Sequence, residues 1–336
     1  MRTRSSALVV AALTVVATLT GCSGSDADLV IYSGRSEELV GPLIEDMEEQ
    51  LDVTIDVRYG DSAELAAQLL EEGDATEADL FFSQDAGALS ALAQEGRLST
   101  LDEQVLAVVD DHYQDPEGRW VATSARARVV TYDPAQAPEA TDFDSVDDLL
   151  DESYRGEIGF APTNASFQSF VTALRITRGE DGARQWLEDF SALEPAAYDN
   201  NVAVLEAVDE GEISLGLINH YYWYQLQEEV GAEAVNAKIH YLDSDDAGAL
   251  VNVAGVGVLT SSEATGLAAD AVEFLLSEEG QQYFADETAE YPVRAGIEST
   301  TYDLVPLDQV DGAQIDLNDL ASLDETLELL DEVGLT

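Results

Sequence analysis

The sequence predicts an α/β protein built from two domains, and three observations support this prediction. Short apolar runs that resemble buried strands alternate with longer amphipathic stretches, and such alternation is typical of parallel strands joined by crossover helices. Turn residues such as Asp133 and Pro134 separate neighbouring stretches. The length of 336 residues favours two domains over a single hydrophobic core.

The predicted elements follow one another along the whole chain after residue 28. Strands are expected at 29–33, 53–59, 78–82, 120–123, 128–132, 157–161, 196–199, 213–218 and in the apolar run 249–259. Helices are expected at 36–49, 62–71, 87–94, 146–150, 166–177, 182–190, 201–209, from 219 onward, at 265–277, 280–289 and 320–333. Open α/β layers bind ligands beyond the carboxyl ends of strands and at helix N-termini, so the strand-to-helix junctions are the places to look for a site.

The N-terminus predicts export. A basic start at residues 1–4 precedes the apolar stretch 7–18, which is shorter than the ~20 apolar residues that a spanning helix needs. Residues 19–22 (Leu-Thr-Gly-Cys) resemble a lipobox and end at Cys22, the only cysteine. We therefore expect 1–22 to be a lipoprotein signal that ends at the lipidated cysteine, 23–28 to be a linker, and the mature chain to be anchored to the outer face of the cell membrane by lipid on Cys22.

The composition restricts the environment and the partners. The formal net charge is −55, although 46% of the residues are hydrophobic, and Lys238 is the single lysine. Disorder would require low hydrophobicity as well as charge, so the chain is expected to be a folded protein with an acidic surface. Its self-repulsion is screened only by concentrated salt, which predicts a halophilic protein. Nucleic acid is excluded as a partner because its binding requires clustered Lys and Arg.

The aromatic segment 219–224 (Asn-His-Tyr-Tyr-Trp-Tyr) directly follows the apolar strand expected at 213–218. Tyr221 and Tyr222 would place two phenol oxygens beside one cavity, and phenolate oxygen suits a small, highly charged cation such as ferric iron better than thiolate or imidazole does. The alternative is an aromatic helix start that packs into a core. On this evidence the segment suggests a protein that captures iron.

Seven short motifs occur in a specific order along the mature chain. They are VIYSG (30–34), ADLFF (78–82), SARARVVTYD (124–133), YRGEIG (154–159), NHYYWY (219–224), GALV (248–251) and EYPVR (290–294). This succession resembles the ferric-iron-binding substrate-binding proteins of ABC importers. The resemblance implies a two-lobed periplasmic-binding-protein fold of type II, in which two mixed sheets flanked by helices are joined by two crossing hinge strands.

The resemblance also implies how the chain divides. Lobe 1 is expected to contain 29–126 and 248–297, and lobe 2 to contain 127–247 and 298–336. One crossing should lie near 126–130 and the return crossing near 248–252. The two lobes would close over the ligand.

The iron ligands that the family implies are only partly present. The tyrosine pair that binds ferric iron corresponds to Tyr221 and Tyr222. The variable histidine of the family corresponds to Ser36, which we expect at the rim of the cleft. Fewer protein donors would leave coordination positions for water or for a synergistic anion, for which the family commonly uses carbonate, phosphate or citrate.

The variable acidic ligand corresponds to Gln84, and Asp85 is next to it. Asp85 would supply an oxygen ligand, or it would cap the following helix. Some family members add a tyrosine in the segment that is 163–167 here, where this chain has Phe167. Gln84 and Asp85 are therefore the candidate metal ligands of the first lobe.

The expected anion pocket is better preserved than the metal ligands. Asn164, Ala165 and Ser166 stand at a predicted helix N-terminus, where free N–H groups and the helix dipole favour an anion. An ordinary N-cap is the alternative for Asn164 and Ser166. Asn201 and Asn219 match asparagines that donate to the anion in the family.

Two arginines lie on the expected hinge strand. Arg126 and Arg128 are two residues apart, so on a regular strand they share a face, and a bidentate arginine there would hold carbonate or phosphate. We assign Arg126 to the anion site; the alternative is a surface ion pair. His220 adjoins the tyrosine pair, but helical neighbours point about 100° apart, so we expect it at the rim of the cleft or in a structural role.

These features together predict an extracytoplasmic, monomeric solute-binding lipoprotein that delivers ferric iron to an ABC permease and its ATPase. The alternative within the binding class is an oxyanion receptor for phosphate, a phosphonate or a sugar phosphate, in which the tyrosines only stack. An enzyme on the same fold is not expected because the sequence has no nucleophile elbow, phosphate loop or dinucleotide fingerprint. A structural surface lipoprotein would show no change on ligand addition.

Overall fold

The computed structural model describes residues 27–243, 246–310 and 315–336. The predicted signal, Cys22 and most of the linker lie outside the described residues. Within the described ranges, no helix is both long and apolar enough to cross a membrane.

A mixed sheet with the strand order β2-β1-β3-β9-β4 forms the first lobe. Its strands are β1 (Leu29–Ser33), β2 (Ile55–Tyr59), β3 (Leu80–Ser83), β9 (Val251–Val258), β4 (Val121–Tyr132) and, paired with β4, β10 (Tyr291–Pro292). The first three run parallel, whereas β9 is antiparallel to both β3 and β4. The helices of this lobe are α1 (Glu37–Leu51), α2 (Ser62–Glu72), α3 (Ala86–Gln94), α4 (Glu103–Leu106), α8 (Thr265–Leu275) and α9 (Glu278–Glu287).

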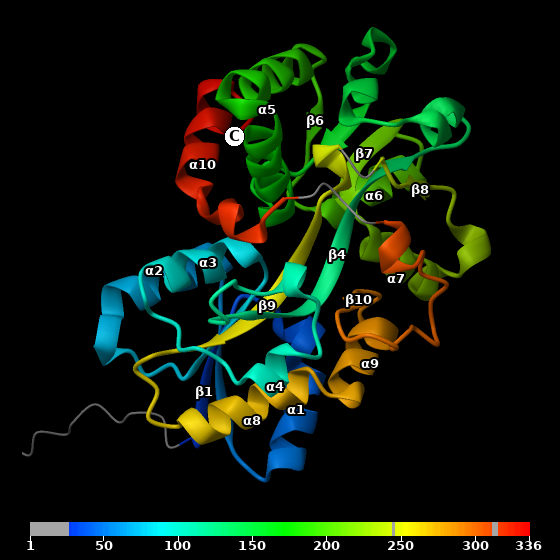
Figure 1. Cartoon of the computed structure of the whole chain (residues 1–336). Coiled ribbons are helices and arrows are strands. Elements are labelled where there is room, and N and C mark those ends of the chain that lie inside the picture. Colours follow the sequence, from blue (N-terminus) through cyan, green and yellow to red (C-terminus); the bar gives the residue numbers. More distant parts are fainter. Residues whose placement is uncertain (1–26, 244–245, 311–314) are drawn as a thin grey trace, which may run out of the picture.

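A second mixed sheet, with the order β4-β7-β5-β6, forms the second lobe (Figure 1). Its further strands are β5 (Ile158–Phe160), β6 (Ala196–Ala197), β7 (Leu215–Asn219) and β8 (Lys238–His240), which pairs with β4. The helices are α5 (Ala165–Ala192), α6 (Asn201–Asp209) and α7 (His220–Val230). Gly179 interrupts α5 with φ 71°, a left-handed conformation that glycine adopts readily, so the sequence correctly predicted two helical stretches here.

Strand β4 belongs to both sheets and forms one of the crossings between the lobes. Ala127 pairs with Val251 of β9, and the next residue, Arg128, pairs with Asn219 of β7. The sequence predicts two separate strands at 120–123 and 128–132, but β4 is continuous and all twelve of its residues are buried. The prediction of a break was wrong because the polar residues Ser124 and Arg126 interrupt the apolar pattern between the two stretches, whereas the structure buries both of them in the strand.

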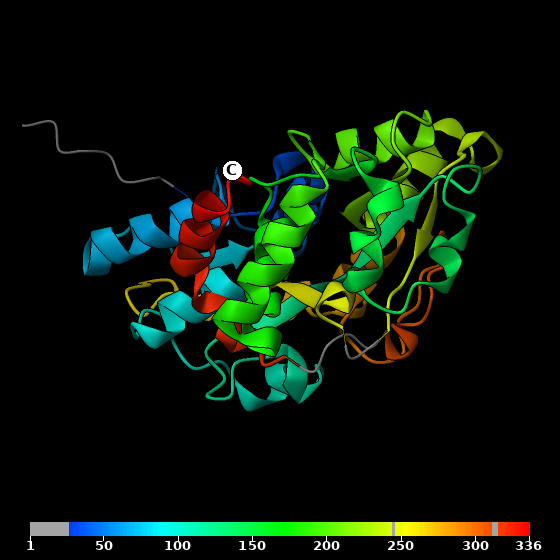
Figure 2. The ribbon, with the colours of Figure 1, turned by 90° about the horizontal axis from the view of Figure 1, so that it is seen from above.

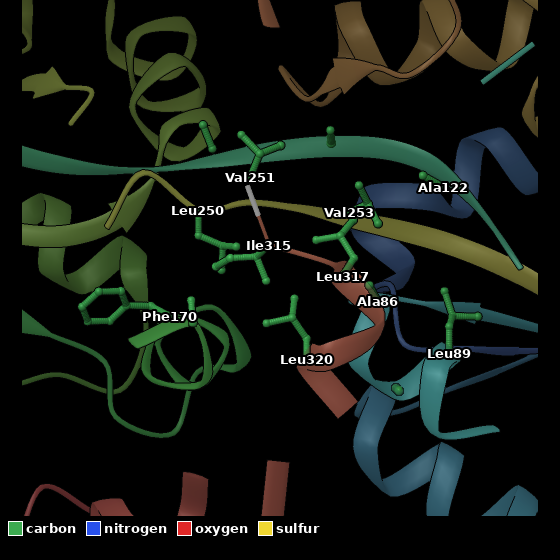
Figure 3. Packing of buried hydrophobic residues seen from close by; sticks show 14 of the residues in the cluster. Ala86, Leu89, Ala122, Phe170, Leu250, Val251, Val253, Ile315, Leu317 and Leu320 are labelled. Atoms are coloured by element: carbon green, nitrogen blue, oxygen red, sulfur yellow. The ribbon is translucent and has the colours of Figure 1, made fainter. Parts of the chain in front are cut away.

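The C-terminal part of the chain contacts both lobes. The short 3₁₀ helix η9 (Leu317–Ala321) packs on α3, where Asn318 accepts a 3.1 Å hydrogen bond from Ser90. A Cβ on Gly87 would lie 2.6 Å from the backbone oxygen of Leu320, so this close approach requires glycine at position 87. Figure 3 shows Leu317 and Leu320 beside Val253 of β9 and Ala86 of α3.

The last helix, α10 (Leu323–Glu332), returns to the second lobe and packs against α5. Nη1 of Arg175 donates to Ser322 and Thr326, and the hydroxyls of Thr172 and Thr326 lie 2.7 Å apart. Figure 2, from above, shows α10 alongside α5. The chain therefore passes between the lobes in β4 and between β8 and β9. After β10 it contacts the second lobe at Asp303, the first lobe at η9 and the second lobe again at α10.

Candidate functional site

The candidate site is centred where β7 ends and α7 begins. The five residues of β7 are buried, and Asn219 is both the last strand residue and the N-cap of α7. The Asn219 side chain is buried and makes no capping hydrogen bond to the helix. Because β7 pairs with β4, the first turn of α7 lies next to the crossing strand, as expected for a ligand site at a strand-to-helix junction.

Tyr221 and Tyr222 stand side by side in this first turn. Their ring centroids are 4.2 Å apart at an interplanar angle of 37°. Tyr221 is buried and Tyr222 is half-buried. Burial raises the pKa of the Tyr221 phenol well above its ordinary value, the neighbouring Tyr222 and Glu290 raise it further, and the charge of Arg126 opposes them. Tyr221 is therefore protonated at neutral pH, and a strong cation is needed to convert it to phenolate.

Arg126 lies between the first lobe and Tyr221. Its Nη2 donates to the backbone oxygen of Gln84, and among the described residues its buried Nη1 has no hydrogen-bond partner. Burial lowers the pKa of Arg126, while the charges of Glu290, Tyr221 and Asp85 raise it. Arg126 thus places a positive charge where the loop after β3 meets the tyrosine pair.

Asn164, Ser166 and Asn201 form one hydrogen-bonded cluster at the N-terminus of α5. Asn164 Oδ1 accepts from the Ser166 amide at 2.9 Å and from the Ser166 hydroxyl at 2.7 Å. Asn201 Nδ2 lies 3.2 Å from Asn164 Oδ1 and 3.0 Å from Ser166 Oγ. Asn164 therefore is an N-cap, as the alternative interpretation held, and Ala165 is the first residue of the helix. The cap uses the Ser166 N–H, and the Phe167 N–H donates to the backbone oxygen of Asn164. Among the described residues the Ala165 N–H of this turn has no acceptor, so it stays available to an anion.

Arg128 joins this cluster, although Arg126 was the hinge arginine predicted for the anion site. Its Nη1 donates to Ser166 Oγ at 3.2 Å and its Nη2 donates to the backbone oxygen of Leu217 at 3.3 Å. The guanidinium also lies over the rings of Phe167 and Phe170. Burial lowers the pKa of Arg128 to about 9, and within the described chain it forms no ion pair with a carboxylate. Arg128 is thus a buried cation without an ionic partner beside a helix N-terminus.

The two arginines differ because β4 changes partners between them. Arg126 pairs with Asn252 of β9, and Arg128 pairs with Asn219 of β7. Their spacing suggested one shared face, but their guanidinium groups serve different lobes. The sequence carried no signal for this division, because the position of the crossover depends on strand register.

The candidate ligands of the first lobe, unlike the tyrosine pair, form no hydrogen bond or ring contact with one another in the described part of the chain. Ser36 is exposed and caps α1 without a side-chain hydrogen bond. Asp85 Oδ1 accepts from the Ala88 amide at 3.0 Å and so caps α3. Burial raises the pKa of Asp85, and hydrogen bonds from the helix and the charge of Arg126 oppose this. In the described ranges no three His, Cys, Asp or Glu side chains form a group that could hold a metal ion.

His220 is fully buried, so the expected place at the rim of the cleft was wrong, whereas the alternative, a structural role, agrees with its burial. Its Nδ1 accepts from the Ala127 amide at 3.2 Å, and its ring stacks on Tyr291 at 4.4 Å and 13°. Burial lowers its pKa to about 4, so the imidazole is neutral at pH 7. Its burial follows from its position at the inner face of the helix start, which helical geometry alone did not specify.

A buried ion pair, which was not predicted from the sequence, supports the site from the first lobe. Glu290 accepts two hydrogen bonds from Arg35, at 3.0 and 2.7 Å, and one from Ser124 of β4 at 2.7 Å. Both charged side chains are fully buried. Burial raises the pKa of Glu290, but Arg35, Arg126 and Ser124 outweigh it and hold the value below the ordinary one. This pair fixes the segment before Ser36 to the crossing strand.

The structure has two mixed β-sheets, flanked by helices and joined by crossing strands. Polar groups gather where strands lead into helices. This architecture is that of a two-lobed solute-binding protein. The chain belongs to the family described as bacterial extracellular solute-binding protein, whose model matches residues 75–313. Membership in this family confirms the prediction that the protein is a solute-binding protein that acts outside the cytoplasm, and that it is not an enzyme.

Individual relatives agree with this assignment. The chain is 32% identical over 314 residues to the Fe(3+)-binding periplasmic protein of Serratia marcescens, covering 93% of this chain and 92% of the relative. It is 35% identical to iron-bound HitA from Pseudomonas aeruginosa, with a TM-score of 0.85 over 91% of this chain and 99% of HitA. A Trichodesmium protein, IdiA (FutA), described in complex with iron and citrate, shares the fold at 24% identity and a TM-score of 0.78, covering 92% of this chain and 99% of that one. The predicted periplasmic-binding-protein fold is confirmed.

Proposed function

We propose that this protein captures ferric iron outside the cell, together with a synergistic anion, and delivers it to an ABC permease and its ATPase. The adjacent phenols of Tyr221 and Tyr222, held 4.2 Å apart between their ring centroids at the start of α7, are the observation that carries the proposal. Two phenolates are hard, anionic oxygen donors that suit ferric iron. The relatives named above are described as iron-binding proteins.

The metal would displace the phenol protons on binding. Burial keeps Tyr221 protonated in the free protein, and the charge of a bound cation lowers the pKa of its ligand. Arg126 assists this step because its positive charge lies near Tyr221 and opposes the effect of burial. Gln84, Asp85 and Ser36 are proposed to complete the metal or cleft contacts from the first lobe when the lobes close.

The anion would occupy the N-terminus of α5. Asn164, Ala165 and Ser166 supply the first turn, Asn201 is bonded to this turn, and Asn219 lies at the neighbouring helix start. Arg128 contributes the positive charge, because it is buried next to Ser166 and forms no ion pair in the described part of the chain. Carbonate, phosphate or citrate would offset the cost of burying this charge.

One observation favours the second candidate, an oxyanion receptor for phosphate, a phosphonate or a sugar phosphate. The anion cluster around Arg128 is already assembled, whereas Asp85 is used as a helix cap. In such a receptor the tyrosines would stack on the ligand without binding metal. The two functions differ in whether the anion binds in the absence of iron.

Titration of the purified protein in molar salt separates the candidates. We expect ferric iron to bind weakly in anion-depleted buffer and much more tightly when carbonate, phosphate or citrate is added. We expect no comparable binding of phosphate alone, measured by calorimetry. Tight phosphate binding without metal, combined with absence of iron binding, would replace the proposal with the oxyanion receptor.

Anchoring through Cys22 and a monomeric state complete the proposal. The lipobox-like residues 19–22 support the anchor. The boundaries at 126–127, 247–248 and 297–298 are likewise proposed as the divisions between the lobes, with η9 of the last segment packed on α3 of the first lobe. The partner permease would bind the closed form of the protein, loaded with iron.

A further inference from the structure

His220 occupies the position where the ladder between β4 and β7 would continue. The last pair of that ladder joins Arg128 to Asn219, so the next antiparallel pair would join Ala127 to His220. The backbone instead turns into α7 at His220. The imidazole replaces the missing backbone acceptor, because its Nδ1 accepts a hydrogen bond from the Ala127 N–H at 3.2 Å.

The location of this bond matters because Ala127 is at the crossing between the lobes. Ala127 is the last residue of β4 that pairs with β9, and Arg128 is the first that pairs with β7. An amide left without a partner at such a buried point would be costly. The side chain of His220 therefore provides the hydrogen-bond acceptor that the Ala127 N–H of β4 needs, and it fixes the start of α7 to this strand.

The other contacts of the imidazole link it to both lobes. One face stacks on Tyr291 of β10, and Tyr291 pairs with Ala125 of β4 in the first lobe. The rings of Tyr221 and Tyr224 meet the imidazole at nearly right angles, with centroids 5.9 and 6.2 Å away. Figure 1 shows β4, α7 and β10 in this shared region.

We propose that His220 is a positioning residue that holds the tyrosine-bearing start of α7 on the crossing strand β4 and so sets the Tyr221 and Tyr222 phenols for the metal. This inference rests on the proposed function. We do not assign His220 as a ligand: its Nδ1 accepts the Ala127 N–H, and its ring is stacked on Tyr291 and lies against Tyr221 and Tyr224 of α7. Its Nε2 is buried and has no hydrogen-bond partner among the described residues. The required property is a hydrogen-bond acceptor at the place of Nδ1.

Three substitutions separate the acceptor from the bulk of the side chain. In His220→Asn the amide oxygen can occupy the place of Nδ1 and accept the Ala127 N–H. In His220→Gln the amide lies one carbon further out, nearer the place of Nε2, and His220→Leu keeps apolar bulk without an acceptor. His112→Leu, at a half-exposed histidine in the 3₁₀ turn Asp111–Tyr113 of the first lobe, is the matched control.

The experiment is a titration of each full-length variant with ferric iron and phosphate in molar salt, followed by the visible phenolate-to-iron band. We expect His220→Leu and His220→Gln to bind about tenfold more weakly or worse, with a displaced band maximum, as for other residues that orient metal ligands. We expect His220→Asn to stay within about threefold of the unmodified protein, with the unmodified band, since the acceptor is restored. Unfolding midpoints of the metal-free variants show whether each is folded, and if His220→Leu is not, the comparison of Asn with Gln decides.

Unchanged affinity and band in His220→Leu would overturn the inference while leaving the proposed function intact. Equal weakening by Asn and Gln would also overturn it, because the acceptor would then not be the property that matters. Absence of any band in the unmodified protein would overturn both this inference and the proposed function.

Discussion

Nη1 of Arg128 donates a 3.2 Å hydrogen bond to the hydroxyl of Ser166 and so joins the crossing strand to the first turn of α5. The bond brings a buried guanidinium to the end of a helix where backbone N–H groups are also directed. The charge of the guanidinium and the positive end of the helix dipole repel each other at this buried point, unless an anion lies between them. Arg128, rather than Arg126 alone, would therefore connect the proposed anion to the crossing strand.

Replacing Arg128 should weaken the binding of the synergistic anion. We expect Arg128→Gln to reduce the gain in iron affinity that phosphate provides by about tenfold or more, since charge-assisted hydrogen bonds are the strong ones. The measurement is the iron dissociation constant with and without added phosphate.

Arg155→Gln is the control for Arg128→Gln, because Arg155 is an exposed arginine paired with Glu152. It should leave the phosphate effect unchanged. A full phosphate effect in Arg128→Gln would show that Arg128 does not hold the anion.

Glu290 should be a main support of the fold near the site. Glu290→Gln leaves Arg35 buried without its counter-charge, and breaking a buried pair in this way costs about 3–5 kcal/mol of unfolding free energy. The measurement is chemical denaturation in molar salt at neutral pH. Glu152→Gln, in an exposed pair, should change little.

The pH dependence of this effect has a defined direction. The pKa of Glu290 is below its ordinary value of 4.5 in the folded protein, so its stabilising contribution is complete above about pH 4.5 and is lost as the pH falls through the lower folded value. The difference in unfolding free energy between the parent and Glu290→Gln should therefore shrink below about pH 4.5. A difference that grows on acidification would contradict the assigned ion pair.

Much of the fold could be predicted from sequence because alternation of apolar strands and amphipathic helices depends on local pattern. The strand-to-helix junction at Asn219 was found in this way, and so was the interruption of α5 near Gly179. The continuity of β4 was missed, since buried arginines break the apolar pattern that marks a strand.

The site was predictable to the extent that its residues are neighbours in sequence. Tyr221 with Tyr222, and Asn164 with Ser166, are pairs of this kind. The partners of Arg128, Glu290 and His220 are distant in sequence and are selected by strand register and burial. No spacing rule in one sequence encodes such contacts.

Salt should control stability. At a formal net charge of −55, lengthening the screening distance from ~3 Å at 1 M salt to ~10 Å at 0.1 M increases repulsion between surface carboxylates. We expect the thermal unfolding midpoint to fall steadily as salt is removed. A midpoint that does not depend on salt would refute a halophilic protein and would not bear on iron binding.

Cys22 should determine where the protein is found. Cys22 and the residues before it, which form the predicted signal, lie outside the described residues. Expressed in a host that lipidates such signals, the unmodified protein should partition into detergent and lack residues 1–21, whereas Cys22→Ser should be released or left unprocessed. A soluble mature protein that retains residues before Cys22 would contradict the anchor.

The visible spectrum of the purified protein loaded with ferric iron in molar salt tests the central claim most directly. Tyr221 and Tyr222 are the two phenols placed together at the start of α7, so the loaded protein should be coloured by a phenolate-to-iron charge-transfer band. Tyr221→Phe combined with Tyr222→Phe should abolish both the band and tight binding, whereas Tyr59→Phe, at a tyrosine on β2, should change neither. A double variant that binds ferric iron as tightly as the parent, or a parent that binds it without this band, would contradict the account.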